Sequence, residues 1–289
     1  MVDLTAMPAR AALRAVKNEL AAAGCPDAGY DARALFQLAA GQDPLLFDGA
    51  LTPAAAEKLA GLMARRAARE PLQYILGQWD FLDFTLRVGP GVLCPRPDTE
   101  IVCEAAAACL QGCAAPRVLD LCAGTGCLGL GVKRLCPSAR VTCVEKDGAA
   151  YRYLAANAEA ALAKWGVPPP AVTPVQADVF TYWQTLPPES LALITANPPY
   201  LNAAEMAERM PETAREPALA LDGGADGLDF YRLLVRAYRA SLRPGGALVL
   251  EIGFAQAAAV TALARAAGWR TITCKKDYGG NDRALVLQN

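Results

Sequence analysis

A short polar turn follows an apolar run and has the groups needed to hold an amino nitrogen. The run 191–196 is mostly apolar, and Asn197-Pro198-Pro199-Tyr200 comes directly after it. The two prolines fix φ and end any hydrogen-bonded ladder, so the turn should leave its sheet along a rigid path with free carbonyls. The Asn197 side-chain oxygen and the Pro198 carbonyl could each accept one hydrogen of a planar –NH2 group, and Tyr200 could pack on its flat face. This pattern predicts an acceptor site, although Asn-Pro and Pro-Pro are also common in simple loops.

A glycine-rich turn earlier in the chain fits a nucleotide-like ligand. Residues 118–129 read VLDLCAGTGCLG, in which Gly124, Gly126 and Gly129 form G-x-G-x-x-G. Glycines allow a tight turn and a close approach of the backbone, and the N-terminus of a following helix offers unpaired N–H groups. The same letters suit a dinucleotide or S-adenosylmethionine, so this motif alone does not choose between them.

Three carboxylates favour S-adenosylmethionine over NAD. Asp120 comes four residues before Gly124, where it could attract the methionine ammonium but would repel a pyrophosphate. Glu145 ends the next apolar run and could accept both ribose hydroxyls, and Asp178 follows the third run and could accept a hydrogen bond from the adenine amine. Each acid alone could be only the polar end of a buried strand, but strand ends are where such sheets bind ligands. We therefore expect the cofactor to contact Asp120, Cys122, Ala123, Gly124, Thr125, Gly126, Glu145, Asp178, Val179 and Asn197.

The residue composition excludes several kinds of catalysis. The chain has 289 residues and no histidine, which excludes Ser-His-Asp catalysis, histidine-ligated zinc and an imidazole base. Its ten cysteines contain no Cys-x-x-Cys pair and fall within helical and strand patterns. We interpret them as small buried hydrophobes, and we expect neither a disulfide framework nor a metal site.

The charge distribution argues against a nucleic-acid substrate held by electrostatics. Residues 1–90 contain 9 basic and 10 acidic side chains and the remainder contains 19 of each, in agreement with the totals of 28 and 29. Duplex binding by charge needs a basic face. The one dense cluster, Arg65, Arg66 and Arg69, is interpreted as a solvated helix face that could still meet an acidic partner.

The sequence also indicates a protein that is neither membrane-bound nor secreted. Hydrophobic residues make up 54% of the chain, but alanine contributes much of this and no apolar run approaches the roughly 18 residues of a membrane span. The start of the chain has an early acid and an amphipathic pattern in place of a basic start and an apolar block. We expect a cytoplasmic protein.

The hydrophobic period changes near residue 80. Residues 8–69 follow a helical period, with Asp31 interpreted as a helix cap and Thr52-Pro53 as an N-cap followed by the first helical residue. This predicts a helical bundle over residues 1–78. Alternating apolar residues at 84–88, followed by Gly89-Pro90-Gly91, predict a hairpin connector over residues 79–95.

The remaining residues, 96–289, alternate between β-rich and helical stretches. This pattern predicts an α/β fold with a mostly parallel sheet of seven strands, covered by helices on both faces. The last two strands are too close for a helical crossover and should pair antiparallel. The expected strands are 117–121, 141–145, 171–176, 191–196, 247–252, 271–275 and 284–287.

Five motifs are more specific together than any one of them alone. They are EPLQYILG at 70–77, CPRPDTE at 94–100, NPPY at 197–200, REPALALDGG at 215–224 with Gly227-Leu228, and DYGGNDR at 277–283. Together they resemble the HemK/PrmC family of protein-(glutamine-N5) methyltransferases over essentially the whole chain. Two positions depart from the family pattern: Cys122 stands where many members have glycine, and Asp98 where many have glutamate. We derive no role for 215–224, which could equally be a loop leading into a helix near Leu228.

The resemblance implies a Rossmann-like, S-adenosylmethionine-dependent methyltransferase. Its substrate would be the glutamine in the Gly-Gly-Gln loop of peptide chain release factors, with S-adenosylhomocysteine as the second product. The helical domain would recognise the release factor, and residues 96–289 would be the catalytic domain. The turn would hold the glutamine through Asn197, Pro198, Pro199 and Tyr200, with Asn197, Pro198 and Tyr200 as catalytic residues. A monomer acting on protein, with no nucleic-acid or membrane partner, is expected.

The mechanism that follows is in-line transfer of the methyl group to an amide nitrogen. Its acceleration would come from positioning and polarisation, and it needs no strong base, since a methylated, protonated amide readily loses its proton. Three alternatives remain open at this point. They are a DNA adenine-N6 or RNA guanine-N2 methyltransferase, an NAD-dependent oxidoreductase, and a non-catalytic nucleotide-binding module.

Overall fold

The chain folds into two compact units in a computed structural model that describes residues 3–288. The first unit extends to Gln78 and also contains Met210–Arg215, and the second contains Trp79–Arg209 and everything from Glu216 onward. The chain therefore leaves the second unit and returns to it within one loop. None of the helices between residues 3 and 288 has the length and apolar character needed to cross a bilayer.

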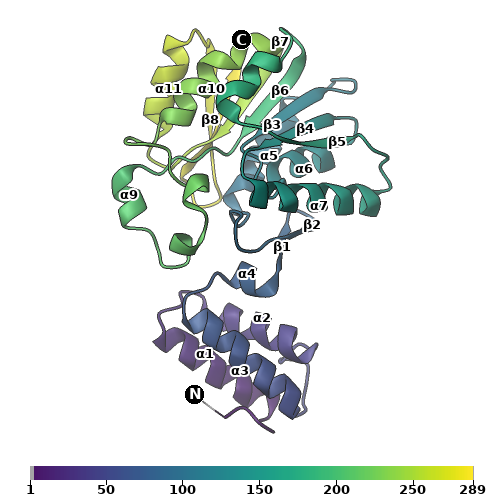
Figure 1. Cartoon of the computed structure of the whole chain (residues 1–289), viewed down its shortest axis with the longest axis vertical. Helices are drawn as coiled ribbons and strands as arrows, with labels where there is room; N and C mark the ends of the chain where they lie inside the picture. Colours follow the sequence, from purple (N-terminus) through teal and green to yellow (C-terminus); the bar gives the residue numbers. More distant parts are fainter. Residues whose placement is uncertain (1–2, 289) are drawn as a thin grey trace. The chain divides into compact units, whose positions relative to one another are not determined.

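Residues 3–78 of the first unit form four helices (Figure 1), and the short helix η2 (Thr213–Arg215) belongs to the same unit. Helix α1 buries Ala12, Val16 and Leu20 along one face, which is the 3.6-residue period expected of an amphipathic helix. Helix α3 begins where the sequence predicted: Thr52 Oγ1 accepts a hydrogen bond from Ala55 N at 3.2 Å, and Pro53 is the first helical residue. The helices are α1 (Ala9–Ala22), α2 (Ala28–Ala40), α3 (Pro53–Ala67) and α4 (Leu72–Leu76).

Asp31 is not a helix cap, so that prediction was wrong. Helix α2 begins three residues earlier, after Asp27, and this places Asp31 inside its first turn. The Asp31 side chain is buried and accepts a hydrogen bond from Arg66 Nε at 2.7 Å. Burial raises the pKa of Asp31, although Arg66 partly offsets this effect. The helical period fixed which residues share a face, but it did not show that this acid faces a cation on another helix.

The arginine cluster is a solvated face only at Arg65, which is exposed, and not at Arg66 or Arg69. Arg66 is buried, and besides Asp31 it donates to Glu212 Oε1 at 2.9 Å. Arg69 donates to both Glu212 oxygens at 2.6 and 2.7 Å, and Arg65 pairs with Glu70. The prediction failed because Glu212 lies more than 140 residues further along the chain. Segment Met210–Arg215 is therefore held in the first unit by buried and half-buried charge pairs.

The second unit contains the predicted seven-stranded sheet, in the order β5-β4-β3-β6-β7-β9-β8 (Figure 1). The five strands from β5 to β7 in this order run parallel, whereas β9 is antiparallel to both of its neighbours, β7 and β8. The predicted fold class is thus confirmed. The strands are β3 (Arg117–Leu121), β4 (Arg140–Glu145), β5 (Val172–Gln176), β6 (Leu191–Ala196), β7 (Leu242–Glu251), β8 (Thr271–Lys276) and β9 (Asp282–Gln288).

Helices cover both faces of this sheet. Alternate residues of each strand point to opposite faces, so Val118 packs in one apolar cluster and Leu119 in the other. The first cluster contains residues of α5 (Asp98–Ala108), α6 (Cys127–Leu135) and α7 (Gly148–Trp165). The second contains residues of α8 (Val179–Tyr182), α10 (Asp229–Ala237) and α11 (Ala257–Ala266). The shorter elements are α9 (Ala203–Ala207), η1 (Trp183–Thr185), η2 (Thr213–Arg215), η3 (Ala218–Ala220) and η4 (Arg239–Ser241).

A two-stranded hairpin precedes the sheet, but it reverses at a different place from the one expected. Strands β1 (Gln78–Phe81) and β2 (Phe84–Arg87) are joined at Leu82 and Asp83, with Leu82 at φ 51°. The alternating apolar residues at 84–88 predicted only strand β2. The strand that pairs with it, β1, comes earlier in the chain and not after Gly91. Gly89-Pro90-Gly91 follows the hairpin, and Gly91 belongs to the wall of the cavity described next.

Candidate active site

A cavity of about 460 Å³ lies at the carboxyl ends of the parallel strands. Its walls come from the turn between β3 and α6, the residues after β4, β5 and β6, and the loops 91–96 and 217–222. Ten of the residues selected from the sequence line it: Asp120, Cys122, Ala123, Gly124, Thr125, Glu145, Asp178, Val179, Asn197 and Pro199. Three other residues selected from the sequence do not line the cavity: Gly126, Pro198 and Tyr200.

Asp120 is a fully buried carboxylate beneath the glycine-rich turn. Its Oδ1 accepts from Thr195 Oγ1 at 2.8 Å, and its Oδ2 accepts from Gly129 N at 3.0 Å. Burial raises its pKa to about 7. A Cβ on Gly129 would lie 2.9 Å from Asp120 Oδ2 and 2.5 Å from Cys143 Sγ, so only glycine lets α6 approach β3 this closely. Asp120 thus links the start of α6 and strand β6 to β3.

The turn above Asp120 has a left-handed backbone. Cys122 has φ 56°, a conformation that costs a non-glycine residue roughly 1 kcal/mol or more, which explains why a glycine suits this position. Gly124 and Gly126 also have positive φ. Thr125 Oγ1 is buried at the cavity wall and makes no hydrogen bond within residues 3–288. A bound polar group would satisfy this atom.

Glu145 supports the turn from the end of β4. Its Oε2 accepts from Gly124 N at 2.8 Å, and its Oε1 accepts from Asp147 N at 2.8 Å. Burial raises its pKa. Each carboxylate oxygen has more than one acceptor site, so Glu145 can hold the turn and still accept from a ligand hydroxyl.

Asp178 lies after β5 and caps the short helix α8. Its Oδ1 accepts from Phe180 N at 2.9 Å, and its Oδ2 pairs with Lys146 Nζ at 2.9 Å. Burial opposes ionisation, but Lys146 and the Phe180 amide outweigh it, and the pKa lies below the ordinary value. Phe180 packs edge-on against Phe230 with ring centroids 5.2 Å apart, and both rings line the cavity. This end of the cavity therefore combines an ionised acceptor with an aromatic wall.

The turn after β6 divides its residues between the cavity and the protein core. Asn197 is half-buried at the cavity wall, and its Nδ2 lies 3.4 Å from Thr99 Oγ1. Pro198 is buried, and Tyr200 packs against the second apolar cluster. The Tyr200 carbonyl accepts from Gln256 Nε2 at 2.9 Å, which fixes the path of the chain as it leaves the turn.

The sequence did not indicate two further parts of the site. Glu216 is buried and accepts from Cys94 N at 3.1 Å and from Arg96 Nη2 at 2.5 Å, and this holds the loops 91–96 and 217–222 together at the cavity. Arg96 and Glu216 both belong to motifs noted in the sequence, but 120 residues separate them.

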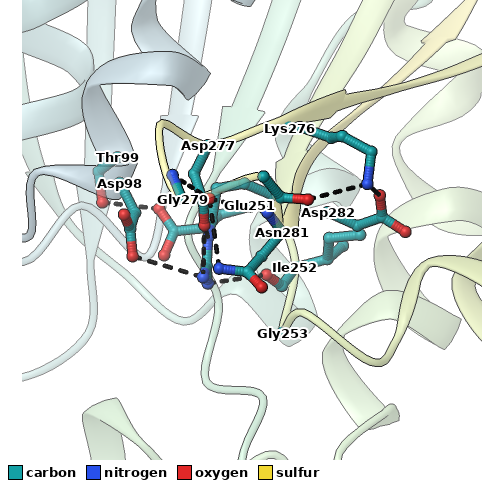
Figure 2. A network of polar contacts seen from close by, with 12 residues as sticks. Asp98, Thr99, Glu251, Ile252, Gly253, Lys276, Asp277, Gly279, Asn281 and Asp282 are labelled. Carbon is teal, nitrogen blue, oxygen red and sulfur yellow. Dashed lines mark hydrogen bonds and ion pairs between the residues drawn. The ribbon is translucent and has the colours of Figure 1, made fainter.

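The second missed part is the pair Thr99 and Glu251, both about 1% exposed. Thr99 Oγ1 donates to Glu251 Oε2 at 2.6 Å (Figure 2). Glu251 is an acid that ends an apolar strand, which is the same signal that revealed Glu145.

Comparisons with known proteins identify the family. The PrmC N-terminal domain model matches residues 11–77, and the Methyltransferase small domain model matches residues 89–225. A release factor glutamine methyltransferase of Cereibacter sphaeroides is 41% identical over 284 residues, covering 96% of this chain and 98% of that protein. A release factor glutamine methyltransferase of Geobacter sulfurreducens is 37% identical, and the alignment covers 93% of this chain and 92% of that protein. The chain belongs to the release factor glutamine methyltransferase family.

Among solved structures, the catalytic domain of hMettl16 in complex with a 3′UTR hairpin aligns with a TM-score of 0.56. The alignment covers 78% of this chain and 81% of that one at 16% identity, so it supports the fold alone. As a release factor glutamine methyltransferase family member, the protein is an S-adenosylmethionine-dependent enzyme, and the oxidoreductase alternative is not supported.

The residues around the cavity fit this cofactor. Three carboxylates, the unpaired Thr125 hydroxyl and an aromatic wall offer complements to an ammonium, hydroxyls, an amine and an adenine ring.

Proposed function

We propose that this protein transfers the methyl group of S-adenosylmethionine to the side-chain amide N5 of the glutamine in the Gly-Gly-Gln loop of a peptide chain release factor. The observation that carries this proposal is the position of Asn197, at the wall of the cavity and directly after the central strand β6. An amide side chain there offers a neutral acceptor to an –NH2 group, and family membership supports a glutamine as the source of that group.

The protein contributes mainly by positioning an amide nitrogen that is a poor nucleophile. S-adenosylmethionine supplies a sulfonium-bound methyl group and leaves as S-adenosylhomocysteine. Asn197 Oδ1 and the Pro198 carbonyl would accept the two amide hydrogens, which polarises the N–H bonds and directs the nitrogen lone pair at the methyl carbon. The amide nitrogen held by these two acceptors would take the methyl group, with the sulfonium sulfur as the leaving group, and would then lose one proton to water. Tyr200 would support the turn through its place in the core.

The cofactor would be held by three carboxylates with different tasks. Glu145 would accept the ribose hydroxyls, and Asp178 would accept from the adenine amine. Asp120 already accepts internal hydrogen bonds at both oxygens, so it would act on the methionine ammonium mainly by its charge. Backbone groups of the turn, from Cys122 to Gly126, would contact the rest of the ligand.

The first unit would recognise the release factor, and we propose that the enzyme acts as a cytoplasmic monomer on protein and not on nucleic acid. The near-balanced charge of both parts of the chain supports a protein substrate. The RNA hairpin named with hMettl16 belongs to that protein and carries no argument for this one.

The test is mass spectrometry of a release factor after incubation with the enzyme and S-adenosylmethionine. One added methyl on the glutamine is expected. Asn197→Ala should lower the rate at least 100-fold because it removes a polarising acceptor, while cofactor affinity measured by calorimetry stays within threefold. The matched control is Asn202→Ala, which removes the N-cap of α9 but no cavity residue and should methylate normally.

Two results would contradict the proposal. The first is a normal rate in Asn197→Ala, which would remove Asn197 from the acceptor role. The second is label transfer to DNA or RNA alone when these are offered beside the release factor.

A further inference from the structure

The side-chain amide of Asn197 has two chemically different ends, and only one of them suits the reaction. An –NH2 substrate needs an acceptor, so Asn197 must present Oδ1 to the cavity and not Nδ2. The two orientations have nearly the same shape. Some other group must therefore select between them.

One buried residue, Thr99, meets the inner end of this amide, and a second, Glu251, meets Thr99. Thr99 is the second residue of α5, Glu251 is the last residue of β7, and Asn197 follows the last residue of β6. Strands β6 and β7 are parallel neighbours, with Ala196 paired to Leu250, so the residues that come next on each strand lie at the same level. Thr99 lies between Asn197 and Glu251 in a chain of hydrogen bonds.

The direction of these hydrogen bonds follows from counting protons. Above its pKa of about 7 Glu251 is ionised and can only accept hydrogen bonds. The Thr99 hydroxyl has one proton, and the 2.6 Å distance to Glu251 Oε2 is typical of a hydroxyl donating to a carboxylate. With its proton used, Thr99 Oγ1 can only accept from a second neighbour. The Asn197 atom that faces it must therefore be the nitrogen Nδ2, and Oδ1 is left for the cavity.

The backbone at Glu251 and Ile252 is held from two sides. The Tyr231 hydroxyl donates to the Glu251 backbone carbonyl at 2.9 Å. Arg283 on β9 donates to the Ile252 carbonyl at 3.3 Å and to Asp277 Oδ2 at 3.0 Å, and its Nη2 lies 3.4 Å from Asp98 Oδ2. Figure 2 shows Thr99 and Glu251 within this network at the end of the sheet. The backbone that carries the Glu251 carboxylate is thus fixed where this carboxylate accepts from Thr99.

We propose that Thr99 and Glu251 are positioning residues that select the orientation of the Asn197 amide and so keep Oδ1 available to the substrate –NH2 group. This inference rests on the proposed function for the identity of the substrate. It adds two residues that act on the reaction through Asn197, and it accounts for a buried carboxylate that the proposed mechanism does not otherwise use.

The first test compares Thr99→Val with Thr99→Ser in the full-length enzyme. Valine keeps the shape of threonine and removes the hydroxyl, whereas serine keeps the hydroxyl and removes a methyl group. We expect kcat for release factor methylation to fall about tenfold in Thr99→Val, the effect of one net hydrogen bond, with the KM for S-adenosylmethionine unchanged within twofold. Thr99→Ser should stay within threefold of the wild type.

A general structural role predicts a different pattern. A kcat for Thr99→Val within twofold of the wild type would overturn the proposal. So would a parallel loss of cofactor affinity, which would place the effect in the cofactor pocket. Failure of Thr99→Ser to restore activity would overturn it as well, because the hydroxyl would then not be the group that matters.

A second measurement does not depend on the substrate. In ¹⁵N-labelled enzyme the side-chain –NH2 signal of Asn197, assigned by its loss in Asn197→Ala, should shift in Thr99→Val and return in Thr99→Ser. An unchanged signal would overturn the proposal. If the signal responds as expected but the wild-type enzyme leaves release factors unmethylated, the orientation of Asn197 stands and the proposed substrate is refuted.

Discussion

Asp120 and Glu251 are both buried carboxylates on parallel strands of one sheet, yet their surroundings give them different tasks. Both are at most 1% exposed, and burial raises the pKa of each to about 7. Asp120 accepts from a backbone amide and from a hydroxyl on the neighbouring strand. Glu251 accepts from Thr99, which in turn meets Asn197 at the cavity.

The difference shows that a perturbed pKa marks a buried acid but does not reveal what it does. Asp120 holds the backbone at the start of α6, because it accepts a hydrogen bond from the Gly129 amide there. Glu251 fixes a proton on a hydroxyl, and through it the orientation of a side chain. The partners of each acid, and not its burial, distinguish a residue that shapes the cofactor turn from one that acts on the acceptor side.

Replacing Asp120 with Ala should have the largest effect, and it should distinguish the task of Asp120 from that of Glu251 most clearly. Gly129 N and Thr195 Oγ1 would both lose their buried acceptor, which should lower the free energy of unfolding by about 3 kcal/mol and weaken S-adenosylmethionine binding at least 100-fold. Glu251→Ala leaves a single hydroxyl without its acceptor and should keep cofactor affinity within threefold. Urea denaturation and calorimetry measure both effects. Equal loss of affinity in the two variants would contradict the division of tasks.

The two acids should look alike in the dependence of stability on pH. Each folded-state pKa is raised to about 7 from ordinary values of 3.8 and 4.5, so the protonated form is favoured in the folded state. The resulting stabilisation is complete below the ordinary pKa and is lost as pH rises through about 7. Between pH 5.5 and 8 each acid should remove about 2 kcal/mol from the free energy of unfolding.

Urea denaturation at these two pH values checks this prediction in Asp120→Asn and Glu251→Gln. Each substitution should reduce the loss between pH 5.5 and 8 by about 2 kcal/mol relative to the wild type. An unchanged pH dependence in either variant would mean that its carboxyl does not titrate in this range.

Two glycines of α6 offer a matched pair that isolates the role of Asp120. A Cβ at Gly129 or at Gly131 would lie 2.5 Å from a cysteine Sγ, but only the one at Gly129 also meets Asp120 Oδ2, at 2.9 Å. Both alanine variants should lose about 1 to 2 kcal/mol of stability through overpacking. Only Gly129→Ala should also weaken S-adenosylmethionine binding, by about tenfold in calorimetry. Weaker binding in Gly131→Ala as well would point to general loosening of α6.

Cys122→Gly should have the smallest effect. Glycine relieves the left-handed backbone at φ 56° but also removes a side chain packed against the second apolar cluster, so the two effects oppose each other. We expect the free energy of unfolding to change by less than about 1 kcal/mol and cofactor affinity to stay within threefold. Thermal unfolding and calorimetry measure these quantities. A larger change in affinity would show that the cysteine side chain itself contacts the ligand.

Much of the fold could be predicted because its signals are local. Apolar runs gave the strands, and the acids within, at the end of or after them gave Asp120, Glu145 and Asp178. The short gap before the last strand gave its antiparallel direction. Apart from the position of the hairpin, which depends on the neighbouring strand β1, the places where prediction failed depend on distant partners. Asp31 was taken as a cap because its partner Arg66 lies on another helix, and the hydroxyl of Thr99 gains a role only through Glu251, 152 residues away.

The brief return of the chain to the first unit has a consequence for dissecting the protein. Segment Met210–Arg215 belongs to the first unit, although the residues on both sides of it belong to the second. Glu212 depends on Arg66 and Arg69, and the loop that follows supplies residues 217–222 to the cavity wall. A fragment that begins at residue 79 would keep every cavity residue and yet leave Glu212 without its arginines. The first unit thus cannot be separated by cutting the chain once, because one turn of its structure is encoded within the sequence of the second unit.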